Sequence, residues 1–226
     1  METKNRTKFP RRKAAGDEGR PAPEAAGSAE RDDARRLAFF QAAEPVFERY
    51  GYRKTTVEDV CHAAGASKRT FYGLFADKAD LASRMILHIS QDIVSRWEGA
   101  VTPDMSARKK LERFIDEYVR LGREHRVFGQ MMNDPDWMRA FGQLKDDRQF
   151  RVLMEVVYAV LTEGMKTREF RRLDPEAVTL IIYSLLDTMY YFVPATGAFA
   201  SPFEDEKLAR EIRVFLTQAL IAPERE

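Results

Sequence analysis

The sequence has little of what disulfides, metal sites, membrane spans and polycationic proteins require. A single cysteine, Cys61, excludes an internal disulfide, and with only three histidines it leaves no ligand set for a thiolate zinc site. Lysine plus arginine number 37 and aspartate plus glutamate 36, so the formal net charge is +1. This balance excludes a histone-like polycation, but a nucleic-acid site can still occupy one small surface. The longest nearly apolar run, residues 178–193, is too short for a spanning helix and contains Asp187.

The N-terminal residues are polar and basic and include no apolar segment, so we expect no secretory signal, no membrane contact and a cytoplasmic protein. Enzyme signatures are missing as well. The chain has no Gly-x-Ser-x-Gly elbow, no Walker loop, no His-Glu-x-x-His pair and no dinucleotide fingerprint. The sequence therefore predicts a protein that is not an enzyme and that uses neither a cofactor nor a metal.

What the sequence does have is helical periodicity. Hydrophobic residues make up 44% of the 226 residues, which is enough for a globular core. From residue 31 onward almost every segment repeats apolar residues at the spacing of one helix face, and no useful segment alternates with period two. We therefore predict an all-α fold with about nine helices. They span residues 31–51, 55–64, 67–75, 77–97, 104–124, 126–132, 150–164, 174–193 and 204–220. Pro45 predicts a bend in the first helix.

The first 30 residues are predicted to be a disordered basic tail. Residues 1–13 carry six basic residues against one acid, and residues 17–30 are rich in Ala, Gly, Pro and Glu. Neither stretch has the apolar periodicity that would offset its ordering entropy. Two interpretations remain open: a solvated extension, or an arm that adds phosphate or minor-groove contacts.

The most informative segment is residues 55–81. Two short predicted helices flank a tight turn at Ala64-Gly65-Ala66, and the second one presents Ser67, Lys68, Arg69, Thr70 and Tyr72. Phe71 and Phe75 point back to the first helix, which is the layout of a helix-turn-helix. Cations and hydroxyls suit phosphates and base edges, and the Tyr72 hydroxyl suits a phosphate. Lys78, at the start of the following helix, adds charge beside free backbone amides.

At these residues the sequence resembles the TetR family of transcriptional regulators. The resemblance lies in Gly51-Tyr52, residues 55–60, residues 63–68, residues 70–72, Phe75, Lys78 and Leu81, and it covers residues 31–81. It implies a homodimer with an N-terminal DNA-binding domain over residues 31–81 and a ligand-binding and dimerisation domain over residues 82–226. Thr56, Tyr72 and Lys78 would hold phosphates, and Ser67, Lys68, Arg69 and Thr70 would lie near base edges. Arg69 stands where the family often has glycine, so we expect an added base contact.

The C-terminal part offers a more general pattern. Residues 178–193 are apolar on nearly all sides, so they need cover from more than one surface, and the resemblance places the dimer contact on the last two helices. Soft and aromatic side chains suit either plain core or a pocket for an apolar ligand. The candidate pocket residues are Trp97, Phe114, Tyr118, Phe128, Met132, Met154, Tyr158, Tyr183, Asp187 and Tyr190. Asp187 either accepts a hydrogen bond from a ligand or binds a neighbouring side chain.

The sequence thus predicts a ligand-responsive, dimeric, DNA-binding regulator. A two-fold dimer presents two equivalent recognition helices, so we expect a palindromic operator. We expect repression that is released by a small, largely apolar effector. A transcriptional activator is the first alternative. A helical protein-interaction adaptor without DNA binding is the second, and it leaves unexplained the hydroxyls, cations and tyrosine of residues 67–72.

Overall fold

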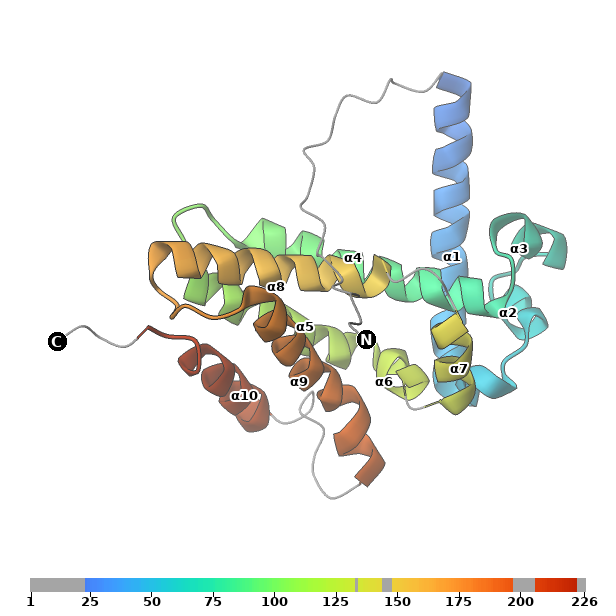
Figure 1. Ribbon diagram of the computed structural model, residues 1–226. Coiled ribbons are helices and arrows are strands. Elements are labelled where there is room, and N and C mark those ends of the chain that lie inside the picture. Colours follow the sequence, from blue (N-terminus) through green and yellow to red (C-terminus); the bar gives the residue numbers. More distant parts are fainter. Residues whose placement is uncertain (1–22, 133, 144–147, 197–205, 223–226) are drawn as a thin grey trace, which may run out of the picture.

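The computed structural model describes residues 23–132, 134–143, 148–196 and 206–222. Over these residues the chain is helical, as predicted, with ten helices and one isolated bridge between Phe170 and Ile221 (Figure 1). The helix that the sequence analysis missed is α7, Pro135–Gln143. None of the helices so described is long and apolar enough to cross a membrane. The same residues bring no three His, Cys, Asp or Glu side chains together at metal-binding distance.

The first three helices form a small unit at one end of the molecule. They are α1 (Pro23–Lys54), α2 (Val57–Ala63) and α3 (Lys68–Leu74). Phe39 of α1 meets Phe71 and Phe75 edge-on, with ring centroids 5.6 Å apart in both pairs. All three rings are buried, as predicted for Phe71 and Phe75. Edge-to-face rings add to the free energy of burial, so this cluster fixes α3 against α1.

The long helix α1 differs from its prediction at its start, while its predicted end at Gly51 coincides with a break in the helix. It begins at Pro23, where proline fits the first helical turn, and so includes residues 23–30 of the predicted tail. Those residues lack an apolar face, but Glu and Ala favour a helix that is already extended from the core. Residues 1–22 lie outside the described part. Inside α1 only Gly51 (φ 76°) has backbone angles outside the helical range, so the helix breaks at this glycine. Pro45, where a bend was predicted, keeps helical backbone angles.

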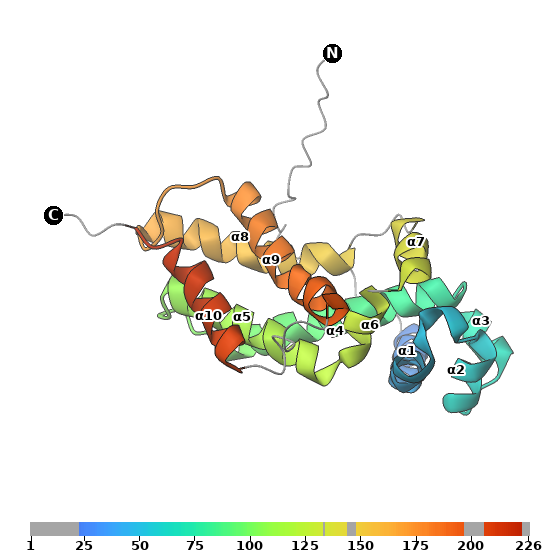
Figure 2. The same ribbon diagram turned by 90° about the horizontal axis from the view of Figure 1, so that it is seen from below.

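The remaining helices form a larger bundle. They are α4 (Lys78–Ala100), α5 (Ala107–Glu124), α6 (Arg126–Met132), α7, α8 (Arg148–Thr167), α9 (Pro175–Thr196) and α10 (Glu206–Gln218). In both views α1–α3 lie at one end of the molecule, while α10 and the α8–α9 turn lie at the other (Figures 1 and 2). Helix α4 runs through the predicted boundary at residue 81, so it belongs to both parts, and the domain division stays a prediction.

Candidate nucleic-acid interface

Helix α3 is placed by a glycine turn and a side-chain cap. Gly65 has φ 60°, a left-handed conformation that other residues adopt at a cost, and this reverses the chain after α2. Ser67 caps α3 by accepting a hydrogen bond from the Thr70 amide at 3.1 Å. Phe71 and Leu74 are buried beneath the helix, while Ser67, Lys68, Arg69 and Tyr72 are exposed. The predicted recognition residues of α3 therefore share one accessible surface.

Thr56, a predicted phosphate ligand, is already engaged in a capping box. Its hydroxyl donates to Asp59 Oδ2 at 2.7 Å and accepts from the Asp59 amide at 3.2 Å. The hydroxyl bond to Oδ2, and a second bond that the Thr56 amide donates to Oδ2 at 2.8 Å, hold the pKa of Asp59 below its ordinary value. Phosphate oxygens only accept hydrogen bonds, so Thr56 would have to release Asp59 before it could donate to DNA.

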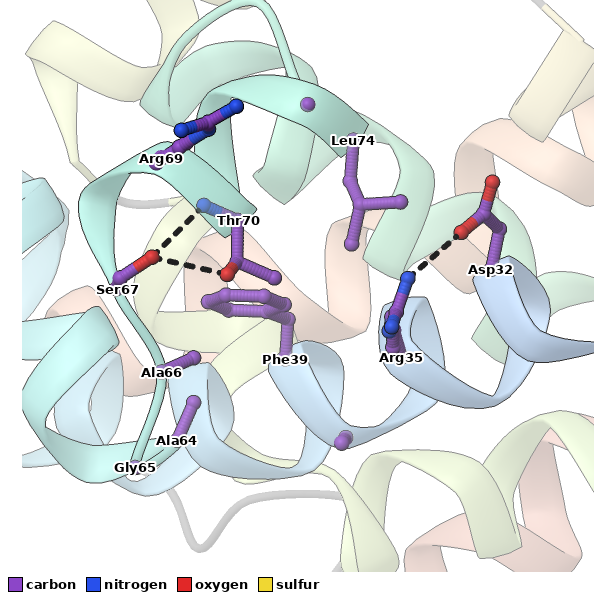
Figure 3. Close-up of a pocket in the computed structure, with 12 residues that line it drawn as sticks. Asp32, Arg35, Phe39, Ala64, Gly65, Ala66, Ser67, Arg69, Thr70 and Leu74 are labelled. Atoms are coloured by element: carbon purple, nitrogen blue, oxygen red, sulfur yellow. Dashed lines mark hydrogen bonds and ion pairs between the residues drawn. The ribbon is translucent and has the colours of Figure 1, made fainter.

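Ser67 and Thr70 act as a hydroxyl pair. Their oxygens lie 2.9 Å apart, and either one can be the donor (Figure 3). The pair has two hydroxyl protons and uses one of them internally. One proton therefore remains for a base edge or a phosphate, and the fixed cap makes its position well defined.

Lys68 and Arg69 are adjacent cations with different surroundings. Lys68 Nζ lies 2.6 Å from Glu58 Oε2 on α2, and this bond raises the pKa of Lys68. Arg69 forms no ion pair with any described residue, and it is exposed. A partnered lysine must exchange one anion for another when it binds DNA, whereas a free guanidinium needs no exchange. Arg69 is thus the cation of α3 that is most ready for a phosphate or a guanine edge.

Lys78 faces inward, which the sequence did not indicate. Its Nζ donates to the carbonyls of Tyr52 at 2.6 Å and Thr55 at 2.8 Å, and it lies 4.2 Å from the centre of the Tyr52 ring. Burial lowers the pKa of Lys78, and burial also raises the pKa of Tyr52 to about 12. Two ammonium protons are committed to the end of α1, which leaves one for the predicted phosphate contact.

A cavity of about 600 Å³ separates α3 from the N-terminal half of α1. Figure 3 shows Arg69 on its α3 side and Arg35 on its α1 side, where Arg35 bonds Asp32 at 3.3 Å. Sequence reasoning missed Arg35, because its helix was expected to begin only a few residues earlier and nothing local relates it to α3. Two cations, two hydroxyls and the Asp32 carboxylate thus border one groove beside the recognition surface.

Besides the two bonds of Lys78, three hydrogen bonds connect α1 to α6 and its flanking residues. His125 Nδ1 lies 2.6 Å from Glu44 Oε1, the Val127 amide donates to Glu48 at 3.2 Å, and the Arg53 amide donates to Asp134 at 3.1 Å. All three join α1 to α6 or to the residues that flank it. A movement of α6 therefore acts directly on the helix that carries the recognition unit.

The predicted pocket residues of the C-terminal part do not form a described cavity. Phe114 and Tyr118 are fully buried in the core, with ring centroids 6.4 Å apart, and Trp97 donates to the Lys110 carbonyl at 2.8 Å. Met154, Tyr158 and Tyr183 are partly buried. The side chains of Phe128, Met132, Asp187 and Tyr190 lie outside the described residues. The pocket stays a prediction.

Comparison with known proteins adds independent findings. Residues 39–85 match the sequence profile of the bacterial regulatory proteins of the tetR family. The HTH-type transcriptional regulator TtgR of Pseudomonas putida is 27% identical over 160 residues, covering 67% of this chain and 76% of its own. The matched profile spans all of α2 and α3, so it coincides with the interface described above.

Two solved structures share the fold across most of the chain. FadR from Bacillus subtilis, in complex with stearoyl-CoA, superposes with a TM-score of 0.66 at 16% identity, covering 81% of this chain and 98% of its own. A tetR-family regulatory protein from Rhodococcus RHA1 gives a TM-score of 0.59 at 20% identity, covering 84% and 98%. At such identities the likeness concerns the fold, and it extends through the C-terminal helices.

Proposed function

We propose that this chain is a DNA-binding transcriptional regulator of the TetR family, and specifically a ligand-responsive dimeric repressor of a palindromic operator. One observation carries the proposal: α3 is held rigidly on the Phe39 cluster and exposes Arg69, Tyr72 and the Ser67–Thr70 hydroxyl pair on one surface. Rigid placement lets these groups meet fixed positions in a major groove.

Dimerisation is supported by exposed apolar side chains on the last two helices. Leu180, Ile181 and Leu185 are exposed on α9, and Val214 and Phe215 are exposed on α10, with Phe215 reaching 70%. Large apolar patches of this kind on a folded chain favour a protein partner. A second copy of the same surface would cover them with two-fold symmetry, and this symmetry is the basis for a palindromic operator.

The effector is proposed to be a small and largely apolar molecule. The C-terminal helices supply many soft and aromatic side chains, and FadR of Bacillus subtilis, which shares this fold, was crystallised with stearoyl-CoA. The bonds between α1 and α6 give such a ligand a route to the recognition unit, because any displacement of α6 strains them. Release from the operator would follow from this strain.

The proposal is tested by selecting binding sites from random duplexes at two salt concentrations. We expect a palindromic consensus that is lost with Tyr72→Ala and kept with Tyr50→Ala, a matched exposed tyrosine on α1. Arg69→Ala should relax the preference at one position by roughly 1–3 kcal/mol. Stearoyl-CoA is then titrated against the complex to measure release. A consensus without symmetry contradicts the dimer, and the absence of enrichment at low salt contradicts DNA binding.

A further inference from the structure

A second cavity, here called the α8–α9 basic cavity, lies at the turn between those helices. Its volume is about 990 Å³, and among the described residues its lining includes Lys166, Arg168, Arg171 and Arg172 but no acidic residue. All four cations are exposed, and none forms an ion pair with a described residue. Several exposed arginines elsewhere do form such pairs, for example Arg108 with Glu112 at 2.9 Å. The cavity thus gathers four positive side chains that have no ion-pair partner among the described residues.

Three described carboxylates near the cavity form bonds elsewhere. Glu163 pairs with Lys110 at 2.6 Å, and Glu169 accepts from the Ala107 and Arg108 amides at 3.2 Å each. Asp174 accepts from the Glu176 amide at 3.0 Å, which caps α9. Each acid stabilises a helix end or a buried lysine and is drawn away from the cavity. The four cations are thus left together without an ion-pair partner among the described residues.

The segment that carries these cations is fixed in place. Phe170 is buried against Gly164, its amide donates to the Gly164 carbonyl at 3.0 Å, and the Arg171 amide donates to the Leu220 carbonyl at 2.9 Å. Arg168 has φ 64°, a left-handed conformation that is uncommon outside glycine. A rigid backbone loses little conformational entropy when a ligand binds, so the charges are preorganised.

We propose that the α8–α9 basic cavity binds a small molecule that carries two or more linked phosphate groups. Guanidinium groups bind phosphate through paired hydrogen bonds, and three of the four cations are arginines. The volume lies in the range of small-ligand sites, and Met165, Pro175 and Ala222 add an apolar wall for an organic portion. The α8–α9 turn lies at the end of the molecule opposite α3 (Figure 1), so an operator bound at α3 would leave the cavity open.

Calorimetric titration of the full chain with inorganic pyrophosphate and with ADP tests this inference without DNA. We expect binding by both probes, and Arg171→Gln with Arg172→Gln should weaken it by at least about tenfold. The matched control, Arg108→Gln with Arg210→Gln, removes the same charge from other surfaces and should leave binding unchanged. Arg168→Gly should weaken binding without lowering the thermal midpoint, because glycine adopts this backbone freely.

The outcomes separate the ligand classes. Tighter binding of ADP than of pyrophosphate supports the site and assigns the apolar wall to the organic portion, whereas equal binding supports the site through its phosphates alone. An equal loss in both double variants means nonspecific charge attraction and overturns the inference. If neither pyrophosphate nor ADP gives a heat of binding at low salt, the inference is overturned as well. Displacement of pyrophosphate by a random duplex overturns it in favour of a nucleic-acid surface. None of these results bears on whether α3 binds an operator.

Discussion

The ion pair between Lys68 and Glu58 is the contact of the recognition surface whose removal we expect to alter DNA affinity most directly. The carboxylate lies 2.6 Å from Nζ and would also face the phosphates of a bound duplex. We therefore expect it to reduce affinity for DNA in two ways: it occupies the lysine, and it repels the strand.

Glu58→Gln should consequently strengthen binding to operator and to unrelated duplexes alike. With one more phosphate contact, the plot of log affinity against log salt should become steeper by about 0.9. Fluorescence anisotropy at several salt concentrations measures this, and adding Lys68→Ala should abolish the gain. Unchanged or weaker binding by Glu58→Gln would show that Lys68 does not reach a phosphate.

Gly164 is the residue at which a single methyl group should matter most for stability. A Cβ there would lie 2.2 Å from the Phe170 ring, which is buried and has no room to move aside. Overpacking of this kind typically costs about 1–3 kcal/mol, so Gly164→Ala should lower the free energy of unfolding by that order. Chemical denaturation measures the loss. Gly99→Ala is the control: its Cβ would meet nothing within 4 Å, so it should be neutral or slightly stabilising. Equal effects of the two substitutions would contradict the packing argument.

At the scale of secondary-structure elements, α1 is joined to the residue that precedes α6 by a titratable pair, Glu44 and His125. The hydrogen bond that His125 donates to Glu44 raises the pKa of His125, burial opposes the shift, Glu124 adds to it and Arg96 opposes it. A histidine whose folded pKa lies above its unfolded value of roughly 6.5 stabilises the native state fully below that value. The stabilisation is lost as pH rises through the folded pKa.

The difference in unfolding free energy between the parent protein and His125→Gln should therefore be largest below about pH 6.5 and shrink at higher pH. It should not vanish, because a neutral imidazole still donates to the carboxylate. Denaturant unfolding at a series of pH values gives the difference directly. Glu44→Gln should reduce the pH dependence in the same way, and a difference that is constant with pH would contradict this linkage.

At the scale of the whole molecule, the exposed apolar surface of α9 and α10 predicts assembly. Ile181→Glu together with Phe215→Glu should give a folded monomer, since both side chains are largely exposed and contribute little to the core of one subunit. Loss of one of two linked DNA contacts should weaken operator binding by about 10²–10⁴-fold. Sedimentation and anisotropy measure the two effects, and circular dichroism checks the helices. Met138→Glu, an exposed apolar residue on α7, should change neither. A double variant that remains dimeric would place the interface elsewhere.

Local signals account for most of what could be predicted. The helix starts at residues 67 and 77 and the buried rings of Phe71 and Phe75 were predicted and are confirmed, with Ser67 and Asp77 as the observed caps. Helix α7 was missed although its start carries such a signal: Asp134 accepts from the Asp136 amide at 2.9 Å, with Pro135 in the first turn.

The sequence by itself determined the helical class, the caps and the glycine turn that sets α3, because each depends on backbone within one turn of chain. Only the tertiary structure decided which charges are free. Glu58 occupies Lys68, two carbonyls hold Lys78, and Arg35 lies across a groove from Arg69. The contact of His125 with Glu44, 81 residues away, depends likewise on how helices cross. Pairing between elements follows from packing geometry, which no local pattern encodes.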